Sequence, residues 1–451
     1  MGFQTVNPYT NSVLDHYSYL SDYDLNETIQ KAHEAFLKFR HKKPSSRSEK
    51  MKCIATLLRK DQQTYALQIT KEMGKPLQQA KAEIEKCAWI CEFYADNAPE
   101  FLKSNSIETD AQNSYISYEP LGVILGIMPW NYPFWQVFRV LAPNLMLGNS
   151  LLIKHSPNTL GCGEMIHKLV IKAGFEPKTF SHLIMEVDKV DTVINHDLVR
   201  GVTLTGSTKA GSIVAAKASK ALKKSVLELG GSNALVVFND ADLDKTADIC
   251  ITARFQNTGQ SCIAGKRLLV QHNIYDNFIN KIKDKIKALK IGDPMDKETY
   301  ISILAREDLA KILKQQLDKS IEMGATLSLG GQQDGCFFEP TLVENVTKDM
   351  PVFKEETFGP LLVAMPFSDK NHAIEIINSS NYGLGVSLFT KNILRYESLF
   401  HKIDDGAVFV NSLVKSDPRL PFGGTKYSGY GRELGEQGLK EFSNQKTIYI
   451  Q

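Results

Sequence analysis

The sequence predicts an α/β protein whose helices cover parallel, doubly wound sheets. Two observations predict this class. Short apolar runs alternate with amphipathic helical stretches through the middle of the chain, as they do where crossover helices join parallel strands. After Asp240 the same rhythm starts again. Since 451 residues are too many for one compact core, we expect two α/β units with a boundary near Gly230–Gly231.

The first hundred residues are expected to be mostly helical. Apolar residues recur at helical spacing between residues 24 and 100. Ser46 and Glu49 fit the capping-box pattern, in which two side chains satisfy free backbone N–H groups at the start of a helix. Residues 114–119 then alternate between apolar and polar side chains, which predicts a strand.

The strands of the two units are expected at short apolar runs. Before Asp240 these runs are 121–128, 150–155, 180–185, 201–206, 225–231 and 233–238. After Asp240 we expect strands at 267–272, 361–366 and 386–390, and helices at 275–290 and 306–323.

Composition excludes several classes of function. The chain has 53 Lys and Arg against 51 Asp and Glu, a formal charge of +2, so no overall field attracts it to nucleic acid or to a membrane surface. Seven irregularly spaced cysteines fit neither a disulfide framework nor a zinc site. We expect a cytoplasmic protein without a metal, in which at least one thiol is kept for chemistry.

The segment 121–153 carries only one formal charge, on Arg139, and is long enough to span a bilayer. Pro129, Pro133 and Pro143 interrupt it, and each proline removes a backbone donor that lipid could not replace. We therefore expect this segment to be buried inside the protein.

Two glycine-punctuated segments are candidates for chemistry. The turn Gly206–Gly211 follows an expected strand and opens a helix, so its N–H groups could hold a pyrophosphate or could simply begin a capped helix. Cys262 lies in a polar loop between Gly259 and Gly265, where it is either a small core residue or a nucleophile. A nucleophilic thiol would need a base or a positive dipole nearby to form thiolate at neutral pH.

A carboxylate and an amide also lie next to expected strand ends. Glu228 precedes Gly230–Gly231 on an apolar strand, so we expect either a structural partner, the simpler reading, or a raised pKa suited to proton transfer. Asn131 lies between two prolines at an expected helix start. It could donate its amide hydrogen to an oxyanion, but capping of the helix is the default reading.

Taken together, these motifs resemble a known family. MPWNYPFW, GSTKAG, LELGGSN, NTGQSC, KEETFGP and PFGGTKYSGYGRE occur in the order and roughly at the spacing of the NAD(P)-dependent aldehyde dehydrogenase superfamily, over about residues 5 to 450. The resemblance implies that Cys262 attacks the aldehyde carbon. It also implies that Asn131 and the Cys262 N–H stabilise the alkoxide, and that Glu228 activates the water that hydrolyses the thioester.

For the cofactor, the resemblance implies a second group of residues. These are Pro129, Trp130, Lys154, Gly206, Ser207, Leu229, Glu356 and Phe358. Many NAD-using relatives carry a glutamate three residues after the lysine, and this chain has Pro157 there. We expect NAD as the cofactor, with NADP as the alternative and Lys154 as the partner of its phosphate in that case.

The expected substrate depends on Arg139. In a helix after Pro133, Trp135 and Arg139 share a face that points back towards Asn131. We expect Arg139 to bind a substrate carboxylate, and the alternative is a pair with a structural carboxylate. An arginine at this place resembles the succinate-semialdehyde dehydrogenases, which implies oxidation of succinate semialdehyde to succinate.

Some semialdehyde enzymes have a second arginine where this chain has Gln256, so Ser416 or another group of the 412–420 loop is expected to complete the anion site. The rival functions are oxidation of another aldehyde, such as glutarate semialdehyde or a neutral aliphatic one, and a non-enzymatic binding role on this scaffold.

The resemblance also implies a division of the chain. We expect a Rossmann-type cofactor-binding domain at 1–101 and 121–229 and a catalytic domain at 230–430. Residues 102–120 and 431–451 would form an oligomerisation flap and C-terminal tail, with a strand near Thr447–Ile450 pairing with the flap. A homodimer or homotetramer is expected, because an exposed strand edge would be a liability in a monomer.

Overall fold

A computed structural model describes residues 2–451 and begins with a hairpin followed by four helices. The hairpin consists of β1 (Gly2–Val6) and β2 (Val13–Ser18). The helices are α1 (Asp22–Phe39), α2 (Pro44–Lys60), α3 (Gln62–Met73) and α4 (Leu77–Phe101). The helical prediction for this region is confirmed, whereas the hairpin was not predicted because its sequence is largely polar and its strands are mostly exposed.

The predicted capping box at Ser46 is wrong. Helix α2 begins two residues earlier, at Pro44, and no side chain caps its N-terminus. Proline at the first helical position has its φ already close to the helical value and has no N–H that would need a partner. The helix is therefore started by Pro44, and Ser46 lies within its first turn.

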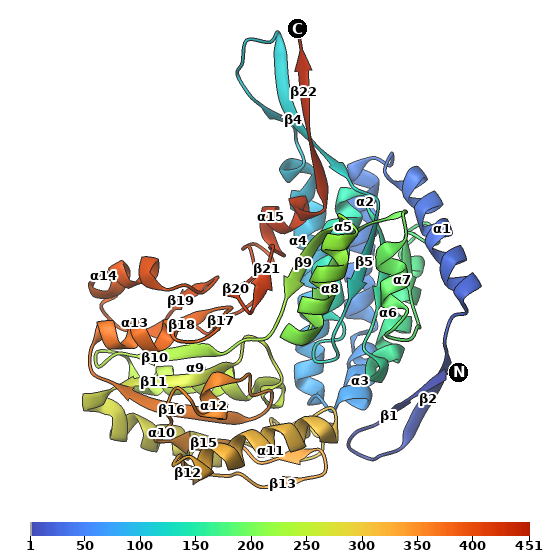
Figure 1. Cartoon of the computed structure of the whole chain (residues 1–451). Helices are drawn as coiled ribbons and strands as arrows, with labels where there is room; N and C mark the ends of the chain where they lie inside the picture. The colour runs from blue at the N-terminus through green and yellow to red at the C-terminus, as the bar shows by residue number, and fades with distance from the viewer. Residues whose placement is uncertain (1) are drawn as a thin grey trace.

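The first sheet has six strands in the order β21-β9-β8-β5-β6-β7. Its parallel strands are β5 (Val123–Ile127), β6 (Ser150–Lys154), β7 (Phe180–His182), β8 (Val199–Thr205) and β9 (Lys224–Glu228). Helices α5 (Trp135–Leu147), α6 (Leu160–Lys172), α7 (Val190–Asn195) and α8 (Thr208–Lys220) connect them (Figure 1). The chain order reverses between β5 and β8, and ligands bind open α/β sheets at such a switch point.

The second sheet has seven strands in the order β12-β15-β16-β11-β10-β18-β19. They are β12 (Thr326–Leu329), β15 (Thr341–Glu344), β16 (Leu361–Phe367), β11 (Gly265–Gln271), β10 (Asn233–Val237), β18 (Val386–Phe389) and β19 (Val408–Val410). All but β12 are parallel. The helices of this unit are α9 (Leu243–Phe255), α10 (Tyr275–Lys287), α11 (Glu307–Glu322), α12 (Pro351–Lys354), α13 (Lys370–Asn378) and α14 (Ile393–Tyr396). The predicted α/β class with two parallel sheets is confirmed.

The chain passes from one sheet to the other between Glu228 and Asn233, and it returns once. Strand β21 (Gly429–Tyr430) pairs antiparallel with β9 of the first sheet. These two residues fall inside the range 230–430 that was expected to form the catalytic domain, so that range does not coincide with one sheet. Sequence periodicity could not show this return because β21 has only two residues.

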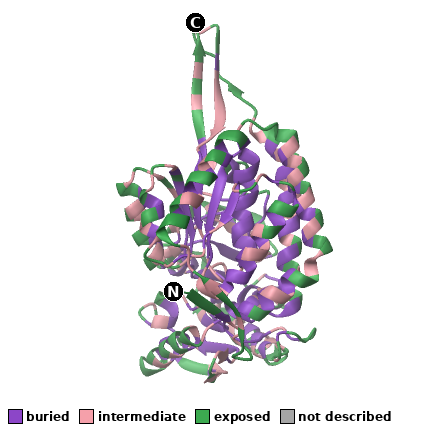
Figure 2. Cartoon of the chain, turned by 90° about the vertical axis from the view of Figure 1, so that its right-hand side faces the viewer, coloured by how far each residue is buried: buried purple, intermediate pink, exposed green. Residues whose placement is uncertain are grey.

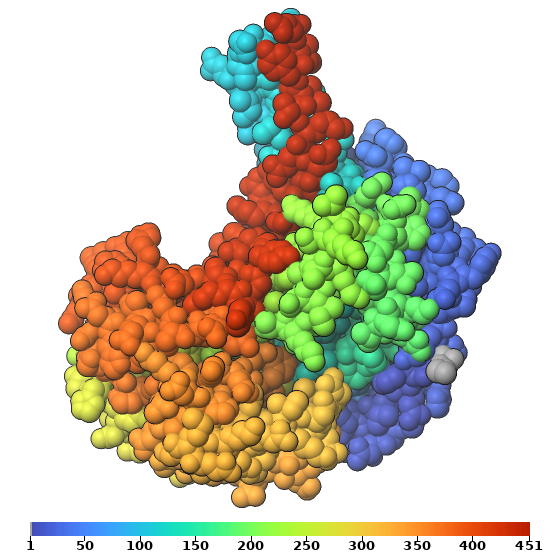
Figure 3. Space-filling view, in the orientation of Figure 1, coloured from blue at the N-terminus to red at the C-terminus, as the bar shows by residue number. Residues whose placement is uncertain are grey.

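A narrow arm projects from the body of the molecule (Figures 1 and 3). It consists of β3 (Asn105–Ser106), β4 (Asn113–Pro120) and β22 (Ser443–Ile450). The whole of β22 pairs antiparallel with β4, from Ser443 opposite Pro120 to Ile450 opposite Asn113. The expected pairing of these segments is thus present, and much of the arm is exposed (Figure 2). Helix α15 (Gly435–Glu441) connects the arm to the body.

The weakly charged segment 121–153 forms β5, α5 and β6, and nearly all of it is buried as predicted. Among the described residues, we find no helix with the length and apolar content needed to cross a membrane.

Candidate active site

A strained turn brings Cys262 to the space between the two sheets. Asn257, Thr258 and Gly259, which follow α9, all have left-handed backbone conformations with φ of 54°, 53° and 73°. Such angles are rare for a β-branched residue like threonine, and strain of this kind gathers at functional sites. The Thr258 Oγ1 atom accepts a hydrogen bond from the Ser302 N–H at 3.2 Å, which fixes the turn.

Glycine is required where this loop meets the end of the first sheet. A Cβ atom on Gly231 would lie 2.0 Å from the carbonyl oxygen of Cys262, and one on Gly259 would lie 2.2 Å from that of Gly359. Any side chain at either place would push the backbone that carries Cys262. The predicted Gly-rich surroundings of Cys262 therefore serve close approach of the backbone.

Cys262 lies where two cavities meet. The larger has a volume of about 650 Å³ and the smaller about 230 Å³, and Cys262 and Gln136 line both. Burial raises the pKa of the Cys262 thiol to about 12, and the positive charge of Arg139 opposes this rise. The thiol is thus open to two separate binding spaces. The positive charge of Arg139 lies near it, but burial outweighs that charge and the pKa of the thiol stays raised.

The larger cavity lies at the carboxyl ends of β5, β6, β8 and β9, which include the switch point of the first sheet. It brings together all eight residues that were expected to bind the cofactor: Pro129, Trp130, Lys154, Gly206, Ser207, Leu229, Glu356 and Phe358. The Ser207 Oγ atom accepts a hydrogen bond from the Ala210 N–H at 3.3 Å. The turn at Gly206 therefore opens a capped helix, and the same turn lines the cavity.

A lysine and a glutamate, Lys154 and Glu356, line the larger cavity. Lys154 is buried, its Nζ atom donates to the carbonyl oxygen of His155 at 3.2 Å, and burial lowers its pKa. Glu356 Oε1 accepts from the Gly231 N–H at 3.0 Å, and burial raises the pKa of Glu356 to about 7. Pro157 lies beside Lys154 in the cavity wall, where it provides neither a hydrogen-bond donor nor a carboxylate.

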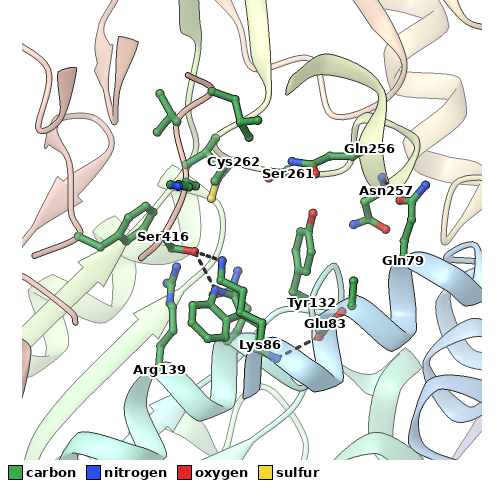
Figure 4. A pocket seen from close by; sticks show the side chains of 18 of the residues that line it. Gln79, Glu83, Lys86, Tyr132, Arg139, Gln256, Asn257, Ser261, Cys262 and Ser416 are labelled. Atoms are coloured by element: carbon green, nitrogen blue, oxygen red, sulfur yellow. Dashed lines mark hydrogen bonds between the residues drawn. The ribbon is translucent and has the colours of Figure 1, made fainter. Parts of the chain in front are cut away.

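The smaller cavity brings together Trp135, Arg139 and Ser416, the residues expected to bind the substrate. Arg139 and Ser416 are labelled in Figure 4. Arg139 is 2% exposed, and its Nε atom lies 2.6 Å from Oε2 of Glu433. The guanidinium also lies over the ring of Phe422, 4.8 Å from its centre. Arg139 therefore has the structural carboxylate partner that was the alternative reading, while it also lines the cavity.

Glu228 ends β9 with a fully buried carboxyl group. The expectation that it has a structural partner is wrong, because neither side-chain oxygen has a hydrogen-bond partner within residues 2–451. Burial raises the pKa of Glu228 well above its usual value, and the neighbouring charge of Glu433 raises it further. A buried, unpaired carboxyl group is the other of the two readings, the one suited to proton transfer.

Asn131 does not cap α5, so the default reading of this residue is also wrong. Its Nδ2 atom donates to the Gln260 carbonyl oxygen at 3.1 Å, and its Oδ1 atom has no partner in the described chain. The free N–H groups of Phe134 and Trp135 instead donate to Oε1 of Glu83 at 2.9 and 3.0 Å. Asn131 lines the larger cavity, which Cys262 also lines.

Sequence reasoning missed several polar residues of the smaller cavity. Helix α4 supplies Glu83 and Lys86, and the loop before it supplies Lys75, whose Nζ atom contacts Oε2 of Glu83. Glu83 lies on the buried stripe of α4, one turn from Ala80 and from Cys87, and this stripe was the only feature of the sequence that pointed to it. A charged residue on an otherwise apolar helix face is buried with a partner or lines a cavity.

Comparison with known proteins matches the whole chain. The model of a family described as the aldehyde dehydrogenase family matches residues 1–448. A probable succinate-semialdehyde dehydrogenase (NADP(+)) of Synechocystis sp. is 41% identical over 453 residues, which are 100% of each chain. The succinate semialdehyde dehydrogenase (NAD(P)+) Sad of Escherichia coli is 39% identical over 448 residues, covering 99% of this chain and 97% of its own.

Solved structures agree with this match. The succinic semialdehyde dehydrogenase of Streptococcus pyogenes, in complex with NADP+, superposes with a TM-score of 0.97 at 39% identity, with 99% of each chain covered. The fold described above is therefore that of the solved relatives over its whole length.

Proposed function

The chain belongs to the aldehyde dehydrogenase family, and on that premise we propose that it oxidises succinate semialdehyde to succinate with NAD(P)+. The observation that carries the proposal is the position of Cys262, whose thiol opens both to a dinucleotide-sized cavity and to a smaller one lined by cationic side chains. The curated relatives named above are succinate-semialdehyde dehydrogenases, which supports this choice of substrate.

The proposed chemistry begins with addition of the Cys262 thiolate to the aldehyde carbon. The carbonyl electrons move to the oxygen, and the amide N–H groups of Asn131 and the backbone N–H of Cys262 stabilise this alkoxide. Asn131 Nδ2 has two hydrogens and gives one to Gln260, so one remains for the oxyanion. NAD(P)+, held by the residues that line the larger cavity, would supply the acceptor for the hydride that leaves the thiohemiacetal as the thioester forms.

Water then hydrolyses the thioester and releases the acid. We propose that Glu228 takes the proton from this water, since its carboxyl group is buried, unpaired and close enough to Cys262 to influence the thiol. Because the pKa of Glu228 is raised, its ionised form is scarce at low pH and increases as the pH rises. Arg139 supplies a nearby positive charge that opposes this rise in pKa.

For the cofactor, we propose NADP+ in preference to NAD+. The larger cavity, about 650 Å³ at the strand ends of the first sheet, fits a dinucleotide. Lys154 and Ser156 line it and could bind a phosphate, whereas Pro157 provides no carboxylate that would accept a ribose hydroxyl. The preference for NAD predicted from the sequence is not confirmed, and two relatives are named for NADP.

Initial rates with NAD+ and with NADP+ at equal concentration test the choice of cofactor. Faster turnover with NAD+ would contradict it.

A substrate panel tests the main proposal. The ratio kcat/KM should be highest for succinate semialdehyde, lower for glutarate semialdehyde and lowest for butyraldehyde, which lacks the carboxylate. Equal values for succinate semialdehyde and butyraldehyde would refute the substrate. Cys262→Ala should abolish formation of reduced cofactor while the protein stays folded, and activity in that variant would refute the covalent route.

We also propose that residues 1–101 and 121–229 act as the cofactor-binding domain and 230–430 as the catalytic domain, with the β4–β22 arm as the contact surface of a homodimer or homotetramer. The seven cysteines are all free thiols, which supports a reducing cytoplasm as the location. The exposed edge and apolar side chains of the arm support assembly.

A further inference from the structure

Lys86 is an unassigned cation in the wall of the smaller cavity. Helix α4 places it there, on the other side of the cavity from the strained turn that carries Cys262 (Figure 4). Its Nζ atom donates to Oγ of Ser416 at 2.8 Å and lies 4.1 Å from the ring centre of Trp135. The side chain is therefore held in one position by a hydrogen bond and an aromatic face.

Ser416 is arranged to act together with this lysine. Its Oγ atom accepts hydrogen bonds from Lys86 and from Nε1 of Trp135, at 2.8 and 2.9 Å. A serine oxygen has two lone pairs, so both are used and the O–H group is left to donate. An ammonium and a free hydroxyl hydrogen at one place form a site for an anion.

The positive charge of Lys86 is not balanced by the protein. Within residues 2–451, no carboxylate forms an ion pair with the ammonium group of Lys86. Three acidic residues in or beside the cavity wall already have other partners: Glu83 contacts Lys75, Glu433 contacts Arg139, and Asp417 contacts Arg419. A partly buried cation is less favourable unless an anion accompanies it. The expected substrate residue Arg139, in contrast, already has Glu433 as its counter-charge.

We propose that the ammonium group of Lys86, with the hydroxyl of Ser416, binds the carboxylate of a short aldehyde acid and so selects it over neutral aldehydes. This inference rests on the proposed function and deepens it. Lys86 makes a direct contact with this carboxylate, and Arg139, which lines the same cavity, also contributes its charge at the thiol and at Glu228. The ligand class is a chain with an aldehyde at one end and a carboxylate at the other.

The charge state of Lys86 makes the selection sensitive to pH. Burial lowers the pKa of Lys86 to about 8, and the charge of Arg139 on α5 lowers it as well. Asp417 from the loop of Ser416 and Glu83 and Cys87 from α4 oppose this shift. Four further ionisable groups line the cavity: Lys75, Tyr132, Lys415 and Cys262. As the pH rises above about 8, the ammonium is lost and its attraction for a carboxylate is lost with it.

The experiment compares kcat/KM for succinate semialdehyde and butyraldehyde in four proteins: wild type, Lys86→Met, Lys86→Arg and the control Lys81→Met. Lys81 is on the same helix but does not line the cavity. We expect Lys86→Met to lower the ratio of the two values about 10- to 100-fold, the range for one charge-assisted hydrogen bond. Lys86→Arg should retain most of the preference, and Lys81→Met should retain all of it.

The pH profile of wild type is a second measurement that does not depend on a variant, and the profile of Lys86→Arg is its comparison. Because kcat/KM reports the free enzyme, the ratio should fall above about pH 8 in wild type and at higher pH in Lys86→Arg. A wild type without preference for succinate semialdehyde would refute the proposed function. A wild type that has this preference, with a ratio that neither Lys86→Met nor rising pH lowers, would refute the role of Lys86 alone.

Discussion

Glu228 shows how one buried side chain can favour activity over stability. Its carboxyl group has no hydrogen-bond partner in the described chain, and burial raises its pKa well above the usual range. An acid whose pKa is raised on folding ionises first in the unfolded state, so the free energy of unfolding falls as the pH rises above the unfolded pKa. Glu228 therefore lowers the free energy of unfolding at neutral pH, and its role in proton transfer accounts for its presence.

We therefore predict opposite effects of Glu228→Gln on turnover and on stability. Steady-state turnover should fall about 10²- to 10⁴-fold, the usual contribution of a general base. The first turnover should still release reduced cofactor, so a burst followed by a slow phase is expected. The Tm should equal or exceed that of wild type, because the amide cannot ionise.

Rapid-mixing kinetics and thermal unfolding measure these two effects. Glu375→Gln is a suitable control, since that glutamate is exposed and lies on α13, where it contacts Lys348. In wild type, hydrolysis of the thioester should accelerate as the pH rises, because more Glu228 is ionised. Glu228→Gln should remove this dependence on pH. Loss of the burst in Glu228→Gln would show that Glu228 acts before the thioester forms.

Arg139 and Glu433 form a buried ion pair beside Glu228, with side chains 2% and 5% exposed and 2.6 Å between Nε and Oε2. Glu433→Gln should lower the free energy of unfolding by about 3–5 kcal/mol, because it leaves the buried guanidinium without its counter-charge. Urea-induced unfolding measures the change. The double substitution Arg139→Met with Glu433→Gln should recover much of the loss, and a double variant as unstable as the sum of the single ones would contradict coupling of the pair.

At the level of the element, the turn before Cys262 has the most specific sequence requirement, which is a glycine at position 259. Gly259 has φ of 73°, and a Cβ there would lie 2.2 Å from a backbone oxygen that cannot move aside easily. Gly259→Ala should therefore displace the loop and lower kcat/KM by more than tenfold. This fall in kcat/KM would result from misplacement of the Cys262 thiol, because residue 259 itself does not contact the substrate.

A matched control separates backbone strain from this close approach. Gly324, just after α11, also has a positive φ of 103°, but nothing lies within 4 Å of a Cβ built there. Gly324→Ala should cost only about 1–2 kcal/mol of stability for the left-handed conformation and leave kcat/KM unchanged. Equal losses of activity in the two variants would mean that close approach at Gly259 is unimportant.

The same elements show how far the sequence could predict the fold and the site. Buried parallel strands such as 150–154 and 233–237 stand out because they are short, apolar and bounded by polar residues. Two-residue strands such as β21 carry no periodic signal, and neither does the polar hairpin at the N-terminus.

For the site, motif residues such as Cys262 and Ser207 could be selected because glycines and helix starts surround them. The pairing of Arg139 with Glu433, 294 residues later in the chain, is a contact between distant segments that no local pattern contains. Lys86 was missed for the same reason, since its partner Ser416 comes from a loop 330 residues away.

At the level of the whole molecule, the arm is the feature that a single chain does not explain. Strands β4 and β22 pair along their full length and extend away from the body, with Tyr449 48% and Ile450 45% exposed (Figures 1 and 2). Apolar side chains on a ribbon with little core of its own are unfavourable in water, and an open strand edge invites pairing with another chain. Contact between arms or between an arm and a second body would bury both features.

We predict that removal of residues 444–451 disrupts assembly more than it disrupts the body. Deleting most of β22 leaves β4 with only its short pairing to β3, so the arm should lose its structure. The body should keep its four buried apolar clusters, because none of the buried residues that form them comes from this segment. Size-exclusion chromatography with light scattering should therefore give a dimer or tetramer for the full chain and a smaller species for the truncated one.

The variant Tyr449→Ser with Ile450→Ser keeps the backbone of β22 and should weaken assembly less than the truncation does. Its assembly should dissociate at a higher protein concentration than the wild-type assembly does. A truncated chain with the same mass as the full assembly would show that subunits associate through another surface, and a monomeric full chain would refute the role of the arm.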